Sequence, residues 1–542
     1  MMRRWGTRIR GRGWSPMVIL AYAGMVGLFL WTLAQFYIPG KGFSYLIAFG
    51  GTQETQRLSK VRRLDYYVEK ASDGYDAQYY VQIAMDPSLQ NRELRKAVDS
   101  LSYRARRILF SATAYGFGLG RPEWILQAYA LQNPAAWLLL AALLLHWFPP
   151  RDWGCFLRWA GVLFSFGMCV SVRNALIDGP SLLLVTLGVL LLERGRPWLS
   201  VLAFGFGGLG KETNLLGAAS LLPRWPAGRR DWLMAVLRGL LVGLPLLLWL
   251  VYLARVVGPV ANAGYRNFDW PFAAYGRKWM EASADLPDVS WPNLGAIWSI
   301  LMLVALTVQF LGLVLRPRWN EAWWRVGATY ALLMVFLGDA VWEGYPGAAS
   351  RVLLPMQVAF NVLVPVGRGW MAVLVLGNLT LLTAPVTLQS PAGGGFVLRG
   401  PAELLNASGG RKVSIEYDKT WYSPEQNGGD YWCWGQGNGS VLVNNPHDRV
   451  LLARIRFTLV AADRRAIQLL HNGPEIWSTT LTGRDQVSVT LNGVELLPGE
   501  NRFDFQTDTP PGKIGSDPRL LAIRLGNLRI DVRQFAEQEI LP

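Results

Sequence analysis

Long apolar runs separated by polar segments, most of them short, make up the first 390 residues. A helix needs about 20 apolar residues to cross the hydrocarbon core of a bilayer. The pattern predicts a polytopic α-helical membrane protein with about eleven transmembrane helices. Two short neighbouring runs are expected to be tilted, broken or re-entrant, and the stretch 108–120 is expected to lie at the interface. The candidate spans are 16–38, 122–148, 157–173, 178–193, 197–210, 211–223, 233–254, 291–315, 325–342, 351–366 and 370–388.

The first run indicates on which side of the membrane the chain begins. A secretory signal peptide has an apolar core of about 7–15 residues, whereas this run extends from Pro16 to Ile38. We therefore interpret it as an uncleaved first transmembrane helix. Arginines accumulate on the cytoplasmic side of membrane proteins. The N-terminus is predicted to be cytoplasmic, because the run follows Arg3, Arg4, Arg8, Arg10 and Arg12.

The charges between the runs agree with this orientation. With eleven spans, the cytoplasmic loops contain only three acids, Asp152, Asp231 and Glu321, and a larger number of arginines. In the outer loop 255–290 the numbers of basic and acidic residues are equal. This asymmetry places the loop 39–107 and everything after about 390 outside the cytoplasm. It also accounts for much of the net charge of +15, so no nucleic-acid partner is predicted. The loop arginines are Arg151, Arg194, Arg196, Arg224, Arg229, Arg230, Arg316, Arg318 and Arg368.

Composition separates a second region from the first. Only 17% of the residues are charged, against about 25% in soluble proteins. After the glycine-rich segment 390–395 no spanning run occurs, and short segments alternate apolar and polar residues between turn signals. We predict a membrane domain at 1–390 and an all-β, jelly-roll-like sandwich at 391–542. The expected strands are 412–417, 440–443, 453–460, 466–470, 486–491, 502–505, 520–525 and 528–532.

Polar and ionisable residues gather at a few predicted outer positions. Ionisable groups at membrane depth cost free energy unless they are paired or hydrated, so they indicate functional cavities. A solvated turn in the first outer loop and helix caps at the interface are the structural alternatives, and spacing alone does not decide between them. The candidates are Asp73 to Ala84 in the loop 39–107, Arg173 and Asn174 with Asp178, Lys211 with Glu212, and Glu343 with Arg351.

Five short motifs occur in order between residues 66 and 360. They are Tyr75-Asp76-Ala77-Gln78-Tyr79-Tyr80, Tyr103-Arg104-Ala105-Arg106-Arg107-Ile108-Leu109, Asp178-Gly179-Pro180, Lys211-Glu212-Thr213 and Ser350-Arg351-Val352-Leu353-Leu354-Pro355. Together they resemble the recurring elements of bacterial GT-C glycosyltransferases, although Ala77 replaces the usual Gly and Lys211 stands where Arg is common. The resemblance implies a GT-C-like domain in the bacterial inner membrane, with its active site on the periplasmic face.

The resemblance also implies a reaction. Such enzymes move a sugar from a polyprenyl-phosphate donor to a hydroxyl of a glycan, lipid-linked or protein acceptor, with inversion in the simplest mechanism. The acceptor proton needs a general base, expected to be Asp76. The leaving phosphate needs cations, expected to be Lys211 and Arg351, while Glu212 and Asp178 would orient sugar hydroxyls or pair with those cations. Further candidates for binding the substrates are Arg104, Arg107, Arg173, Tyr75, Gln78 and Tyr79.

Cofactors are not expected. The chain has three cysteines and three histidines, no pair of cysteines has metal-ligand spacing, and no Asp-x-Asp sequence occurs. Asp73 and Asp76 lie three residues apart and could bridge a divalent ion, but a monophosphate leaving group does not require one. We therefore predict metal independence.

Aromatic residues cluster early in the second domain, as Trp421, Tyr422, Trp432 and Trp434. This domain resembles the carbohydrate-binding sandwiches appended to arabinofuranosyl- and other GT-C transferases, which implies glycan stacking on these rings. Alternatively, the rings form the sandwich core or dock it on the membrane. The sandwich favours a furanose such as arabinose as the transferred sugar, and mannose and other sugars remain alternatives.

Two other functions remain open. A lipid or glycan transporter, or flippase, would place charges near mid-membrane and would show internal repeats, neither of which the sequence contains. A non-catalytic glycan-binding assembly protein would use the sandwich alone. The polar first outer loop favours the enzyme.

Overall fold

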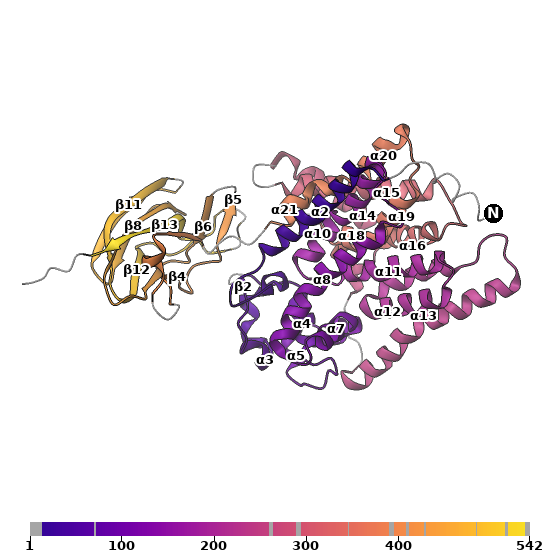
Figure 1. Ribbon diagram of the computed structural model, residues 1–542, viewed down its shortest axis with the longest axis horizontal. Helices are drawn as coiled ribbons and strands as arrows, with labels where there is room; N and C mark the ends of the chain where they lie inside the picture. Colours follow the sequence, from indigo (N-terminus) through magenta and orange to yellow (C-terminus); the bar gives the residue numbers. More distant parts are fainter. Residues whose placement is uncertain are drawn as a thin grey trace, which may run out of the picture. The chain divides into compact units, whose positions relative to one another are not determined.

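The computed structural model describes residues 14–536 except 70–71, 259–263, 289–293, 345, 390–394, 408–410, 428–429, 484, 515–516 and 518. The chain divides into two compact units, and the boundary falls between Ser390 and Pro391. The first unit is helical and the second consists of β-sheets (Figure 1). The second unit also takes in Gly50–Thr52 and Glu69–Asp73.

Thirteen α-helices of eight residues or more lie in the described part of the first unit. They are α2 (Pro16–Ala34), α4 (Ala77–Ala84), α7 (Leu109–Phe117), α8 (Pro122–Leu144), α9 (Trp153–Leu163), α10 (Phe166–Arg173), α11 (Asp178–Glu193), α12 (Pro197–Gly210), α13 (Arg229–Val256), α14 (Ala273–Ala284), α15 (Gly295–Val314), α16 (Ala322–Phe336) and α19 (Leu354–Leu363).

Shorter α-helices and the 3₁₀ helices complete this unit. The α-helices are α3 (Ser59–Arg62), α5 (Leu94–Ala97), α6 (Leu101–Arg104), α17 (Asp339–Trp342), α18 (Ala349–Val352), α20 (Met371–Leu376) and α21 (Ala384–Thr387). The 3₁₀ helices are η1 (Ser44–Ile47), η2 (Gly51–Gln56), η3 (Ala105–Arg107), η4 (Glu212–Leu221), η5 (Tyr265–Asn267), η6 (Leu286–Asp288), η7 (Arg368–Trp370) and η8 (Leu379–Thr383). The loop 39–107 also contains the short strands β1 (Phe49–Gly50) and β2 (Val68–Glu69).

Three described helices, α2, α13 and α15, are long and apolar enough to cross a membrane. Two bent pairs raise the number to five if each pair is one span: α9 with α10, bent by 45°, and Arg368–Leu376 with Leu379–Thr387, bent by 50°. These helices indicate a membrane protein, but the predicted count of about eleven spans is not confirmed.

The remaining predicted spans differ from long apolar helices for local reasons. Helix α8 contains Gln127 and Asn133, whose side chains hold neighbouring segments: Gln127 accepts from the Phe43 backbone at 2.8 Å and Asn133 donates to the Ser171 carbonyl at 2.7 Å. The run 211–223 forms the 3₁₀ helix η4, and 325–342 is divided between α16 and α17. Apolar composition alone therefore does not identify how a segment is folded.

Buried polar side chains hold the helices that follow α8. Asn361 of α19 and Asn378 exchange two hydrogen bonds of 3.0 and 2.9 Å between their amides. The buried Arg158 of α9 donates to the carbonyls of Asn361, Val364 and Pro365 at the end of α19. These contacts satisfy polar groups inside an apolar core, where an unpaired one is costly.

The second unit contains two sheets. The first has the order β10 (Glu475–Leu481), β9 (Arg465–His471), β12 (Gly499–Thr507), β7 (Gly439–Asn445) and β4 (Ser414–Tyr417). The second has the order β11 (Gln486–Leu496), β8 (Leu451–Ala461), β13 (Ile523–Phe535), β6 (Asp430–Trp434) and β5 (Glu425–Asn427), with β3 (Phe396–Arg399) parallel to β13. One short helix, α22 (Ala402–Leu405), lies between β3 and β4 in sequence.

One hydrophobic core lies between the sheets. Phe457 of β8 and Phe505 of β12 meet across it with ring centroids 5.7 Å apart. The burial of β8 alternates at every residue, as its sequence pattern predicts. The prediction of two strands at 520–525 and 528–532 is wrong, because the single strand β13 begins at Ile523 and continues through the second segment, with an irregular register between Gly526 and Arg529.

Candidate active site

The loop 39–107 places Asp76 directly before the first residue of α4. Seven of the eight residues of α4 are buried, which fixes this helix in the core of the loop region. Asp76 stands where an acidic residue often caps a helix, yet its side chain makes no capping hydrogen bond. Its side chain is 37% exposed, so its carboxylate is open to a ligand.

Asp76 shares one guanidinium with a second acid. Arg104 lies 2.9 Å from Asp76 through Nη1, and it donates to both oxygens of Asp99 through Nε and Nη2 at 3.1 and 2.8 Å. Burial alone would lower the pKa of Arg104, but the hydrogen bond to Asp99 and the charge of Asp76 raise it above its ordinary value. Two carboxylates against one guanidinium leave one negative charge in excess at this end of the site.

Asp178 holds two cations at the first residue of α11. Lys211 Nζ lies 2.6 Å from Oδ1, and Arg351 Nη1 lies 3.2 Å from Oδ2. All three side chains are nearly buried, with 5% of Asp178, 10% of Lys211 and 11% of Arg351 exposed. Two cations against one carboxylate leave one positive charge in excess here.

Glycine allows the elements that carry this triad to approach closely. A Cβ on Gly179 would lie 2.6 Å from Asn133 Oδ1, so the first turn of α11 packs directly against α8. A Cβ on Gly167 would lie 2.5 Å from the Ser350 carbonyl, so α18 packs against α10 next to Arg351. The contact at Gly179 explains why a residue without a side chain follows Asp178.

A tyrosine connects the two ends of the site. Arg351 donates from Nη2 to the hydroxyl of Tyr75 at 3.2 Å, and Tyr75 is the neighbour of Asp76 in the chain. The excess negative charge around Asp76 and the excess positive charge around Asp178 therefore lie in one cluster, formed by segments separated by as many as 276 residues.

A further ion pair adjoins this cluster. Arg107 donates from Nε to Glu212 at 2.8 Å and from Nη1 to the Tyr80 hydroxyl at 3.1 Å. Burial would lower the pKa of Arg107, but Tyr80 and Glu212 raise it well above its ordinary value. The guanidinium therefore remains charged while buried.

The other predicted residues of the helical unit have these positions. The ring of Tyr79 lies 5.2 Å from the guanidinium carbon of Arg104, and Gln78 is buried with 1% exposed. Arg173 donates to the Tyr45 hydroxyl and stacks on its ring. Glu343 pairs with Arg266.

Two residues that contact the predicted arginines were not predicted from the sequence: Asp99, which contacts Arg104, and Tyr45, which contacts Arg173. Tyr80 and Tyr103 belong to the predicted motifs, and both contact Arg107. Asp99 lies five residues before Arg104, a spacing that could have suggested a pair, but no chemical motif includes it.

Among the described residues, no group of three or more His, Cys, Asp or Glu side chains is arranged so that it could hold a metal ion. Asp73 accepts a hydrogen bond of 2.7 Å from the Thr52 hydroxyl. Metal independence stays a prediction.

The aromatic residues of the sandwich fall into two groups. Trp421 is fully buried and contacts Phe505 in the core, and Tyr422 is 8% exposed. Trp432 and Trp434 flank the buried Cys433 on β6 and therefore lie on the opposite face of that strand. The guanidinium carbon of Arg524 lies 5.3 and 6.0 Å from their ring centroids.

Comparisons with known proteins give weak similarities. No protein-family model and no curated protein matches the chain. Among solved structures, arabinosyltransferase EmbB from Mycobacterium smegmatis matches 97% of this chain and 66% of its own, with 12% identity and a TM-score of 0.36. A mutant carbohydrate-binding module of family 29 matches 23% of this chain and 86% of its own, with 17% identity and a TM-score of 0.15. A second mutant of this module, solved with mannohexaose, matches 24% and 87% with the same identity and TM-score. Neither similarity is close enough to assign a function.

Proposed function

We propose that the chain is a membrane glycosyltransferase that moves a sugar from a polyprenyl-phosphate donor to a hydroxyl acceptor on the periplasmic face. The observation that carries this proposal is the cluster in which Asp76 shares Arg104 with Asp99 while Asp178 holds Lys211 and Arg351. Such an enzyme needs a base and a phosphate site beside each other, and the two ends of the cluster have the matching excess charges.

In the proposed reaction, the end of the cluster around Asp76 accepts a proton and the end around Asp178 binds the leaving phosphate. The acceptor oxygen attacks the anomeric carbon as its proton passes to the Asp76 carboxylate. The bond between the anomeric carbon and the phosphate oxygen breaks, and its electron pair leaves with the polyprenyl phosphate. Lys211 and Arg351 stabilise the negative charge that develops on that oxygen. Attack from the face opposite the phosphate inverts the anomeric centre.

Asp178 has a positioning role in this mechanism. It holds both cations in place before the donor arrives, so their charges need no reorganisation during the reaction. Arg107 and Glu212 pair with each other beside the cluster, and Glu212 would orient a sugar hydroxyl through its other oxygen. That oxygen is buried and has no hydrogen-bond partner among the described residues.

The sandwich supplies a second contact with glycans in this proposal. Trp432 and Trp434 present their rings on one side of β6, and aromatic faces stack on the apolar faces of sugars. Trp421 takes no part, because it lies fully inside the core. Arabinofuranose or mannose is the sugar we propose, on a glycan, lipid-linked or protein acceptor.

The transporter alternative predicts a different set of effects. A flippase would move the lipid-linked sugar without breaking its glycosidic bond, so it needs no base. Its loss would deplete surface glycan as well, but Asp76→Asn would leave the function intact.

Mass spectrometry of envelope glycans tests the proposal in cells. A strain lacking the protein should lose one sugar substituent, and the wild-type gene should restore it. The Asp76→Asn gene should fail to restore it, while the matched control Asp65→Asn, an exposed acid of the same loop, should succeed. Full restoration by Asp76→Asn would exclude Asp76 as the base.

A further inference from the structure

A basic surface outside the candidate active site lies where α15 ends and α16 begins. The connecting turn carries Arg316 and Arg318, and no ion pair in the described part of the chain involves either residue. The guanidinium carbon of Arg316 lies 3.9 Å from the ring centroid of Trp370 in η7. Because the indole contacts the face of the guanidinium, the N–H donors along its edge stay available for an anion.

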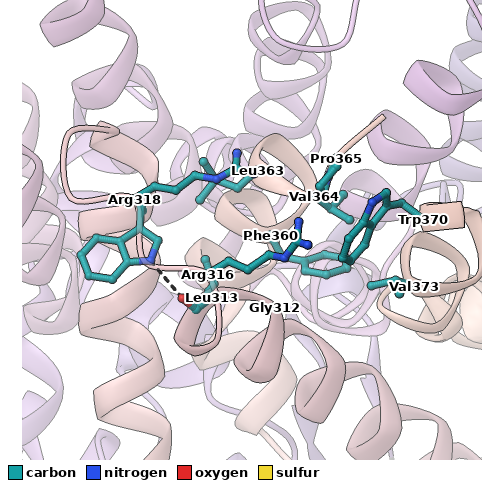
Figure 2. A pocket seen from close by; sticks show the side chains of 11 residues that line it. Gly312, Leu313, Arg316, Arg318, Phe360, Leu363, Val364, Pro365, Trp370 and Val373 are labelled. Atoms are coloured by element: carbon teal, nitrogen blue, oxygen red, sulfur yellow. Dashed lines mark hydrogen bonds between the residues drawn. The ribbon is translucent and has the colours of Figure 1, made fainter. Parts of the chain in front are cut away.

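The two arginines extend over a narrow crevice at the end of α19. Figure 2 shows Arg316 directed towards Trp370 and Arg318 directed towards Leu363. The buried residues Leu313 and Phe360 form its apolar floor. Its volume of about 20 Å³ suffices for a water molecule and excludes an acyl chain.

Arg318 also lines a larger, open hollow of about 750 Å³. This hollow is lined by Trp225, Trp232 and Trp319, and the acidic residue Glu321 lines it as well. Trp225 is 69% exposed. Its backbone is nevertheless held in place by Asn320: the Trp225 N–H donates to Asn320 Oδ1 at 2.7 Å, and the Trp225 carbonyl accepts from Asn320 Nδ2 at 3.2 Å. Exposed indoles beside an arginine are typical of the headgroup layer of a membrane.

The apolar surface next to the arginines indicates which anion reaches them. Val314 and Leu315 directly precede Arg316 and are 50% and 71% exposed, at the end of a helix apolar enough to cross a membrane. Lipid tails that cover these side chains bring their headgroups to the level of Arg316.

We propose that this surface binds an anionic phospholipid of the leaflet at this end of α15. Its phosphate pairs with Arg316 and Arg318, its headgroup occupies the tryptophan-lined hollow, and its acyl chains lie along the outer side of α15. Basic pockets between transmembrane helices bind such headgroups in other membrane proteins.

Native mass spectrometry of the full-length protein tests the site, with phosphatidylglycerol or phosphatidylcholine added in detergent. We expect the wild type to retain one more phosphatidylglycerol than the double variant Arg316→Gln/Arg318→Gln, whose affinity should fall about 30-fold. The matched control Arg194→Gln changes an exposed arginine in the turn between α11 and α12, and it should retain the lipid. Inorganic phosphate should not displace the lipid, since it makes no contact with the apolar surface.

Three results would overturn the proposal: equal retention by the double variant and the wild type, equal retention of phosphatidylcholine, or displacement by inorganic phosphate. A salt titration of the wild type gives a second test that does not depend on the folding of a variant. Retention should fall as salt rises, because screening weakens exposed ion pairs, and a flat response would also overturn the proposal.

Discussion

Removing the Asp178 carboxylate tests whether the buried triad is held by its charges. Asp178→Asn keeps the shape of the side chain but leaves Lys211 and Arg351 as two adjacent cations with 10% and 11% of their side chains exposed. Breaking a buried pair by removing one partner costs about 3–5 kcal/mol, since the remaining charge is uncompensated. Here two charges remain, so we expect a loss at the upper end of that range.

A second change should recover part of this loss. The wild-type triad has one positive charge in excess, Asp178→Asn has two, and Asp178→Asn/Lys211→Met again has one. The double variant should therefore be more stable than the sum of the two single changes implies, by an interaction energy of about 0.5–3 kcal/mol. Lys211→Met alone leaves the Asp178–Arg351 pair intact and should cost less than Asp178→Asn.

Equilibrium unfolding of the purified chain in mixed micelles measures these differences. The four proteins form a double-mutant cycle, and Asp65→Asn serves as an exposed acidic control. Additive losses, or wild-type stability of Asp178→Asn, would refute the reasoning that the three charges act together.

Three further predictions concern packing, the sandwich and metals. In Gly377→Ala the new Cβ would lie 2.3 Å from the Phe360 ring, so we expect a loss of about 1–3 kcal/mol; an unchanged thermal midpoint would show that the ring can move. Trp421→Ala should destabilise the sandwich by about 3–5 kcal/mol, because that indole is fully buried. Trp432→Ala should leave the unfolding of the sandwich unchanged but reduce its retention on an immobilised glycan. If Trp421→Ala and Trp432→Ala had the same effects, the division of these aromatic residues into a core group and a glycan-binding group would be wrong. EDTA should leave glycosyl transfer unchanged, whereas a loss restored by Mg²⁺ or Mn²⁺ would contradict metal independence.

Many residues of the cluster could be predicted from the sequence, but few of the contacts between them could. Asp76, Asp178, Lys211 and Arg351 were identified by local motifs, and the structure brings them together. The contact from Arg351 to Tyr75 joins residues 276 positions apart. No local pattern encodes such a contact, because it depends on how the helices pack.

The fold shows the same division between local and tertiary information. Strand β8 was predictable because its burial alternates at every residue, whereas β10 was missed because most of its residues are exposed. Helix α13 follows from hydropathy alone. In contrast, the predicted span 211–223 contains the 3₁₀ helix η4, so hydropathy did not predict its conformation.

A transfer assay with purified protein tests the central claim most directly. The full-length chain is reconstituted with a polyprenyl-phosphate-linked pentose or hexose and a hydroxyl acceptor, and the release of polyprenyl phosphate is measured together with the glycosylated product. We predict that the wild type and Asp65→Asn release lipid phosphate in equal amount to product, and that Asp76→Asn lowers the rate by about 10²–10⁴-fold, the contribution of a general base. Transfer by Asp76→Asn at the wild-type rate would contradict the account.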